Sequence, residues 1–445
     1  MAYDHAMSLM QDSLTFAPTL DTQHSQLVTR RGFYGVLPLD YASYLIQLGE
    51  LRQAIETLEK GRALLWSKLR GLHKVTALNG DFETLMLTVS KPSNGDGDDS
   101  IKGMDRIGLL LLQPRKLLDE RETLISQARA LPESEKFLKA PSFDTLSLAT
   151  LRGPVVIINH SKWRSDIIIL HHDSPPSLIS TADYLYHRAI EFRDRFTTCR
   201  IERSRLKASL KVSNIDDGVK RYFCDLYIPS CTPTLSASVE SQKLSKESSE
   251  KPSILLVAQS DQSLLSTLPE IWAINRLDTK VTTLMLSKAT PSAVMGKLRD
   301  HWFLHFACHG KLEDGKPFDA SFQLHNGKRL TMLELIQSQL PTAEFAFLSA
   351  CHTAEMTEGS VADETLHLTA AMQHCGFRSV VGTMWGMADA DGPDLVDRFY
   401  KSMFSAKQAG TAYYERSARA LRMQCKTNEK ELGPLGAMGE LCSLW

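Results

Sequence analysis

Short apolar runs alternate with helical patterns throughout the second half of the chain. Five runs rich in β-branched and aliphatic residues have the length of buried strands, and a segment with apolar positions at helical spacing follows each of them. The runs cover residues 254–258, 281–285, 302–308, 345–351 and 379–383. The helices are expected to begin near residues 264, 290, 331, 365 and 393. This alternation predicts an α/β fold with a mostly parallel sheet and helices on both faces.

The first part of the chain has a helical pattern. Between residues 40 and 71, apolar positions recur at helical spacing in two segments that a glycine separates. Small residues stand where paired helices must approach closely: Ala42, Gly49, Ala54 and Gly61. The pattern resembles one tetratricopeptide repeat, whose stacking face needs flanking helices to cover it. Together with an amphipathic helix expected over residues 109–130, it predicts an α-helical, tetratricopeptide-like region over residues 1–150.

The composition shifts just after residue 150. Residues 154–159 and 166–170 are β-branched runs separated by a polar turn, which predicts a hairpin that opens a sheet domain. A helical stretch follows over residues 181–210, and residues 236–253 are rich in Ser, Lys and Glu, a composition typical of a mobile linker or surface loop. We therefore expect a second domain over residues 151–445.

Composition excludes several classes of function. The 445 residues carry a formal net charge of −1, so no overall basic field favours nucleic acid. No apolar run approaches the roughly 18 residues of a membrane span, and the first residues lack the pattern of a secretory signal. Eight cysteines without the spacing of a small disulfide framework favour a reducing compartment. We expect a cytoplasmic protein with no membrane span and no nucleic-acid partner.

Two candidate reactive side chains follow predicted strands. His309 comes after the third strand and Cys351 ends the fourth, 42 positions later, with one helix expected between them. Parallel strands present their C-terminal ends at one edge of the sheet, where open α/β sheets place their ligands. An imidazole within reach of a thiol makes it an effective nucleophile. Gly310 lets the backbone approach a substrate closely, and its N–H is a candidate oxyanion donor.

Each residue also has a simpler interpretation. His309 alone is more typical of a hydrogen-bonded structural histidine, and Cys351 alone of a small buried hydrophobe. A zinc site is a further alternative, because five nitrogen and sulfur ligands lie close in sequence. They are His305, Cys308, His309, Cys351 and His352. Against zinc, His305 and Cys308 are expected on opposite sides of a strand, and no paired C-x-x-C spacing occurs.

Taken together, the motifs resemble those of the CHAT family, a branch of the caspase-like cysteine peptidases. The matching pieces are Phe-Ala-Cys-His-Gly ending at Gly310, Leu-Ser-Ala-Cys-His-Thr ending at Thr353, and the stretch 370–385 followed by Asp389. Residues 153–166 look like the start of this domain in fungal members. The resemblance covers roughly residues 150 to 425, and the preceding helices fit a tetratricopeptide–CHAT arrangement.

The resemblance implies a role for each matching residue. Cys351 would be the nucleophile, and His309 the general base and then the acid that protonates the leaving amine. The backbone N–H groups of Gly310 and Cys351 would hold the oxyanion. Asp389 is the first candidate for recognising a basic P1 side chain, with Asp166 second; a helix N-cap is an equally simple role for Asp389. We expect no cofactor and no metal.

Two segments depart from the family pattern. Residues 211–224 lack an expected strand sequence, and the tail after Arg422 has no recognisable closing strand. Loss of either strand would leave a sheet edge unpaired.

Three functional hypotheses follow from the sequence. The first is a cysteine endopeptidase that acts on a protein or peptide substrate and is regulated by a protein partner on its N-terminal helices. The second is a catalytically silent scaffold that uses the same surfaces for assembly. The third is a zinc-stabilised interaction domain.

Overall fold

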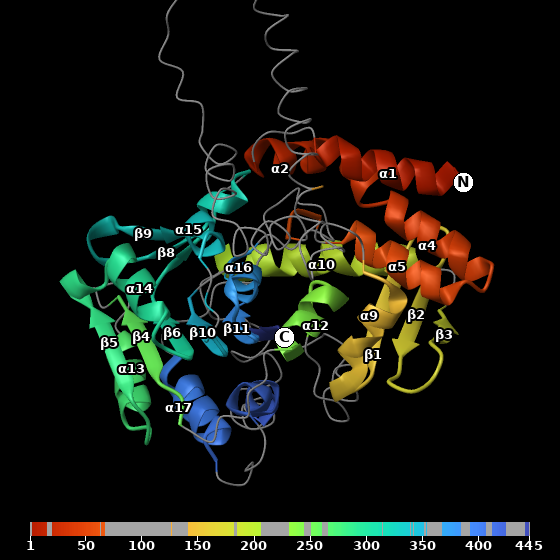
Figure 1. Cartoon of the computed structure of the whole chain (residues 1–445). Coiled ribbons are helices and arrows are strands. Elements are labelled where there is room, and N and C mark those ends of the chain that lie inside the picture. Colours follow the sequence, from red (N-terminus) through yellow and green to blue (C-terminus); the bar gives the residue numbers. More distant parts are fainter. Residues whose placement is uncertain are drawn as a thin grey trace, which may run out of the picture. The chain divides into compact units, whose positions relative to one another are not determined.

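The computed structural model divides the chain into two compact units. The described residues of the first unit run up to Ala189, and those of the second begin at Ile190. Figure 1 draws the whole chain with its helices and strands labelled. The structure describes residues 2–15, 20–62, 64–66, 126, 141–181, 185–205, 231–243, 251–259, 266–313, 315–338, 340, 342–350, 353, 367–383, 392–405, 412–423 and 441–444.

The first unit begins with helices. They are α1 (Ala2–Thr15), α2 (Leu20–Thr29), α3 (Arg31–Tyr34), α4 (Leu37–Gln47), α5 (Leu51–Gly61), α9 (Phe143–Ser147) and the 3-10 turn η1 (Leu148–Arg152). Helices α4 and α5 form the predicted hairpin. Gly49 has φ +82°, a conformation that favours glycine, and a Cβ at Gly61 would lie only 2.2 Å from Pro38. The small residues therefore allow both the turn and the close helix contact.

A three-stranded antiparallel sheet completes the first unit. The predicted hairpin is present as β1 (Val155–His160) and β2 (Ser165–Leu170), and β3 (Ser177–Ser180) pairs with β2 on the other side. Two hydrogen bonds join the hairpin to α4: Asn159 Nδ2 donates to Ser43 Oγ at 2.9 Å, and Ser161 Oγ donates to Asp40 Oδ1 at 2.7 Å.

Two helices precede the central sheet of the second unit. The predicted helical stretch is present as α10 (Leu185–Arg205). The prediction of a loop over residues 236–253 is wrong for its first part, which forms α12 (Leu235–Lys243). Leu235 and Val239 are buried one turn apart, and Thr234 Oγ1 accepts from the backbone N–H of Ala237 at 3.1 Å. One cap and two apolar residues specify this helix despite its polar composition.

The central sheet has the predicted strands in the order β12–β11–β10–β6–β4–β5. The five parallel strands are β4 (Ile254–Ala258), β5 (Val281–Met285), β6 (Phe303–Ala307), β10 (Phe345–Ser349) and β11 (Ser379–Thr383). The sixth strand, β12 (Leu441–Leu444), pairs antiparallel with β11. The expectation that the tail lacks a closing strand is therefore wrong, because these four residues cover the β11 edge.

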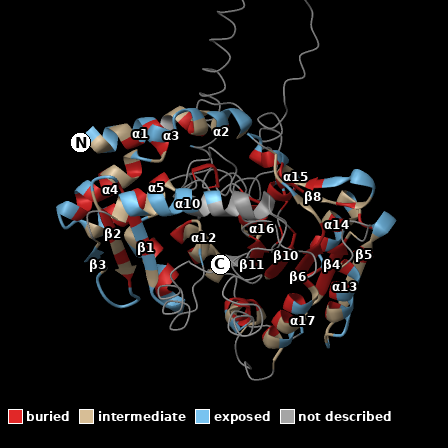
Figure 2. Cartoon of the chain, turned by 180° about the vertical axis from the view of Figure 1, so that it is seen from behind, coloured by how far each residue is buried: buried red, intermediate tan, exposed pale blue. Residues whose placement is uncertain are grey.

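Helices cover both faces of this sheet. They are α13 (Thr267–Asn275), α14 (Pro291–Leu298), α15 (Met332–Ile336), α16 (Leu368–Cys375) and α17 (Gly392–Met403), with the 3-10 turns η2 (Leu286–Lys288) and η7 (Tyr413–Arg416). Every residue of β4, β6, β10 and β11 is buried (Figure 2). This explains why these strands read as continuous apolar runs and not as alternating ones.

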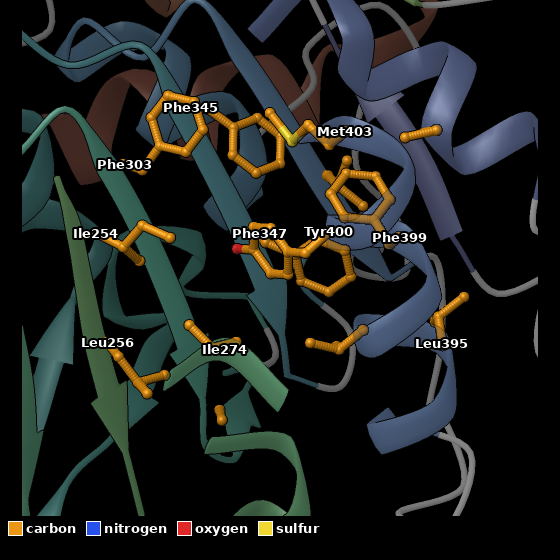
Figure 3. Close-up of a cluster of buried hydrophobic side chains, with 14 of the residues drawn as sticks. Ile254, Leu256, Ile274, Phe303, Phe345, Phe347, Leu395, Phe399, Tyr400 and Met403 are labelled. Atoms are coloured by element: carbon orange, nitrogen blue, oxygen red, sulfur yellow. The ribbon is translucent and has the colours of Figure 1, made fainter. Parts of the chain in front are cut away.

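The main core lies on the face that α13 and α17 cover. Phe303, Phe345 and Phe347 point from neighbouring strands toward Phe399 and Tyr400 of α17 (Figure 3). The Phe347 and Phe399 rings meet edge to face with centroids 5.0 Å apart. Burial of such large rings fixes β6 and β10 relative to each other, and the candidate site lies at the C-terminal ends of these two strands.

A small antiparallel sheet extends from the end of β6 and was not predicted. It consists of β7 (Gly310–Lys311), β8 (Ser321–Gln323) and β9 (Arg329–Thr331), with the 3-10 turns η3 (Pro317–Asp319) and η4 (His325–Gly327) between them. Its strands have two or three residues, too few for a periodic pattern to stand out.

Two predicted features lie outside the described residues, namely the helix over 109–130, apart from Ser126, and the atypical segment 211–224. No described helix has the length and hydropathy of a membrane span.

Candidate active site

His309 stands where the chain leaves the central sheet. It follows β6 by two residues and precedes β7, and its carbonyl accepts the backbone N–H of Gln323 at 2.8 Å. Gly310 pairs with Phe322 of β8. The half-buried His309 is thus fixed on both sides by strands, one in each sheet. Gly310 has the extended backbone of a strand, which any residue can adopt. Its proposed role therefore depends on its lack of a side chain, which lets a substrate approach the backbone.

The strands before His309 and Cys351 are direct neighbours. β6 and β10 are parallel and pair from Phe303 with Phe345 to Ala307 with Ser349. The Cys308 N–H continues this ladder to the Ser349 carbonyl at 3.4 Å. His309 and Cys351 each follow the last paired residue of their strand by two positions. Cys351 itself and the following His352 lie outside the described residues.

Buried threonines hold the chain on both sides of Cys351. Thr383, at the end of β11, donates its hydroxyl to the carbonyl of Ala350. Its Oγ1 also accepts the Thr353 N–H at 3.3 Å, and its own N–H donates to Thr353 Oγ1 at 2.8 Å. All three residues are buried. The residues at positions −1 and +2 from the candidate nucleophile are therefore tied to one threonine of the adjacent strand.

The start of α16 supplies a second set of contacts to the same segment. The Thr353 carbonyl accepts the N–H of Thr369 at 2.9 Å and its hydroxyl at 2.8 Å. A Cβ at Gly382 would lie 2.4 Å from Thr369 Oγ1 and 2.8 Å from Thr353 Oγ1. Only glycine at this position leaves room for the two threonines between β11 and α16.

His367 caps α16 next to this threonine network. Its Nδ1 accepts the Ala370 N–H at 3.1 Å. Burial lowers the pKa of His367 to about 4. The side chain is therefore neutral near neutral pH, which leaves Nδ1 free of a proton to act as the cap.

His305, one of the residues of the zinc hypothesis, has another role. His305 points into the helix-covered core, where its Nε2 lies 2.8 Å from Glu270 Oε1 and its Nδ1 lies 3.0 Å from the Tyr400 hydroxyl. Within the described part of the chain, no three His, Cys, Asp or Glu side chains gather in a way that could hold a metal ion.

The structure describes Asp166 but not Asp389. Asp166 lies in β2 of the first unit, and its buried carboxylate accepts two hydrogen bonds from Arg164, both at 2.7 Å. Asp389 and the residues from 384 to 391 lie outside the described residues.

Sequence analysis missed the partners of these residues. Arg164 precedes Asp166 by two positions, and Thr353 follows Cys351 by two, so both were visible as motif neighbours. Thr383 is 30 positions from Thr353, and only the pairing of β10 with β11 brings the two together. A single sequence carries no signal for such a long-range polar contact.

Comparison with known proteins gives one family match. The model of the CHAT domain matches residues 207–432, slightly more than half of the chain. No curated protein matches significantly. Among solved structures, separase in the Saccharomyces cerevisiae separase–securin complex is similar at 16% identity and a TM-score of 0.34, over 48% of this chain and 14% of that one. The Arg-specific cysteine proteinase gingipain R is similar at 8% identity and a TM-score of 0.31, over 43% of this chain and 45% of that one.

The chain thus spans less than half the length of either of these two proteins. The extent of the family match, together with the parallel sheet that carries the quoted motifs at its strand ends, establishes that this chain belongs to the CHAT domain family.

Proposed function

We propose that this protein is a cysteine endopeptidase whose nucleophile is Cys351 and whose general base is His309. The observation that carries the proposal is the pairing of β6 with β10, whose last paired residues, Ala307 and Ser349, each stand two positions before a member of the dyad. The matched CHAT domain includes both residues. We further propose that the helical region before this domain is tetratricopeptide-like and that the protein is cytosolic.

The proposed reaction divides peptide hydrolysis into two steps. The Cys351 sulfur attacks the scissile carbonyl while His309 takes the thiol proton, and the His309 imidazolium then protonates the amine as the C–N bond breaks. In the second step His309 takes a proton from water, which attacks the thioester carbonyl, and the proton returns to the sulfur as the C–S bond breaks. The N–H groups of Gly310 and Cys351 donate to the oxyanion in both steps.

Substrate selection rests on a carboxylate in this proposal. Asp389 lies between β11 and α17 in sequence, and β11 runs parallel to β10, which pairs with β6. We assign it to recognition of a basic P1 side chain. Asp166 is the weaker candidate, because Arg164 already occupies its carboxylate with two hydrogen bonds.

Hydrolysis of a fluorogenic peptide with Arg at P1 tests the dyad. Cys351→Ala and His309→Ala are expected to lower kcat by at least about a hundredfold, since each removes a group that acts in the transition state. His172→Ala changes a half-exposed histidine between β2 and β3 of the first unit and is the matched control, with wild-type kcat expected. Equal loss in the His172 variant, or wild-type turnover without Cys351, contradicts the proposal.

A second experiment tests the role proposed for Asp389. Asp389→Ala is expected to raise KM for the Arg substrate more than for a neutral P1 substrate, because a charge contact in the bound complex is lost. Asp319→Ala, at an exposed position of η3, is the control. Equal KM changes for both substrates would contradict the assignment of Asp389.

A further inference from the structure

We propose that the first unit carries a binding pocket for a basic side chain of a protein partner, with Asp40 as the residue that recognises the positive charge. The pocket has a volume of about 610 Å³ and lies between α4 and the turn that joins β1 to β2. Its walls include Asp40, Tyr44, Trp163 and Arg164. Pockets of this size are typical of ligand sites, and the peptidase proposal uses only one of its lining residues, Asp166, as the weaker candidate for P1 recognition.

Two hydrogen bonds hold the opposite walls of the pocket together. Ser161, in the β1–β2 turn, donates to one oxygen of Asp40 at 2.7 Å. Asn159, at the end of β1, donates to Ser43 one turn further along α4 at 2.9 Å, and both of these side chains are buried. The turn and the helix are therefore fixed in place before any ligand binds, which lowers the entropic cost of binding.

The charges in the pocket leave a net negative site. The Arg164 guanidinium is neutralised by its two hydrogen bonds to Asp166, and this pairing raises the pKa of Arg164 further. Asp40 accepts only the neutral Ser161 hydroxyl, and within the described part of the chain no cationic side chain lies within ion-pair distance of it. A cationic ligand would supply the missing charge, whereas an anion would meet Asp40 and an arginine that is already engaged.

Aromatic rings at the pocket can pack against the alkyl part of a basic side chain. Trp163 is 70% exposed and Tyr44 is 47% exposed, so both rings offer apolar surface that a ligand could cover. Tyr3 lies beside Tyr44 with ring centroids 5.8 Å apart. The Lys162 ammonium lies 4.6 Å from the Trp163 ring centroid, so this ring face already receives a cation from its own chain.

An arginine or lysine in an exposed segment of a partner fits these features. Its charged end would pair with the free oxygen of Asp40, and its alkyl stem would lie against Tyr44 and Trp163. The proposal does not depend on peptidase activity, because the lining residues belong to the first unit and none of them is part of the dyad.

Photo-crosslinking of the full chain tests the pocket. The protein carries Cys351→Ser to prevent cleavage, and the probe is a biotinylated heptapeptide with a central arginine next to a benzophenone residue. The matched probe has citrulline, which keeps the shape of arginine without its charge. We expect saturable crosslinks on the tryptic peptides from residues 153–188, which include Trp163, with about fivefold weaker crosslinking by the citrulline probe.

Variants give the second half of the test. Asp40→Asn keeps the acceptor for Ser161 but removes the charge, and it is expected to weaken the arginine crosslink about fivefold. Asp173→Asn, at a highly exposed position of the turn before β3, is expected to crosslink as wild type. Unchanged thermal unfolding of both variants establishes that the fold is intact. Equal crosslinking by both probes, wild-type crosslinking by the Asp40 variant, or crosslinks confined to the second unit would overturn the proposal.

Discussion

At the scale of single residues, the threonines around position 351 are the most informative finding. A nucleophile that attacks a carbonyl must be held in a narrow range of positions, and an error of about 1 Å can cost a hundredfold in rate. Thr383 contacts Ala350 before Cys351 and Thr353 after it. We therefore regard Thr383 as a positioning residue for the proposed nucleophile.

Replacement of Thr383 separates positioning from folding. Thr383→Val keeps the shape but leaves the Thr353 N–H and the Ala350 carbonyl without a partner, at a cost of about 1–3 kcal/mol in the free energy of unfolding. We expect kcat for the peptide substrate to fall about tenfold or more, with little change in KM. Thr383→Ser restores the hydroxyl and should restore kcat. If the Val and Ser variants had the same kcat, the hydroxyl would have no positioning role.

At the scale of secondary-structure elements, α16 depends on the protonation state of its cap. The folded-state pKa of His367 is about 4 against an ordinary value of 6.5, so between these values the unfolded chain binds the proton more readily than the folded one. The stability contributed by neutral His367 is complete above about pH 6.5 and is lost as the pH falls toward 4.

Urea unfolding at two pH values tests this dependence. At about pH 5, protonation of His367 in the unfolded chain is expected to lower the free energy of unfolding by about 2 kcal/mol relative to neutral pH. His367→Asn keeps a side-chain oxygen that can cap the helix and removes the titrating group. The free energy of unfolding of this variant should therefore fall by about 2 kcal/mol less than that of wild type between the two pH values. An identical pH dependence in wild type and variant would show that His367 does not titrate with folding.

A comparison of predicted and observed helices and strands indicates how much of the fold could be predicted from the sequence. The buried strands β4, β6 and β10 and the helices between them were predicted because apolar runs and helical spacing of apolar residues are local signals. The helix α12 was missed because its composition is polar, and β7–β9 because their strands are very short. The strands that precede His309 and Cys351 could be predicted from the apolar runs, whereas the Thr353–Thr383 contact depends on which strands pair.

At the scale of the whole molecule, the last described residues close the central sheet. The four residues of β12 pair with β11 from Val380 with Leu444 to Thr383 with Leu441. Without this strand, the backbone N–H and C=O groups along one side of β11 would be exposed, and an open edge promotes association between chains.

Deletion of residues 441–445 tests the role of the closing strand. We expect a lower temperature of thermal unfolding and concentration-dependent aggregation in light scattering, because the β11 edge becomes available to other chains. Deletion of Trp445 alone leaves β12 intact and is the matched control. A truncated protein that remains monomeric and unfolds at the wild-type temperature would show that β12 contributes little.

The central claim is that Cys351 is a nucleophile activated by His309, and covalent labelling tests it most directly. An acyloxymethyl ketone peptide with Arg at P1 is added to wild type, Cys351→Ala and His309→Ala, and intact mass with peptide mapping locates the adduct. The account predicts one adduct on Cys351 in wild type, none in the Cys351 variant and much slower labelling in the His309 variant. Labelling of wild type on other cysteines, or labelling of Cys351 at an unchanged rate without His309, would contradict it.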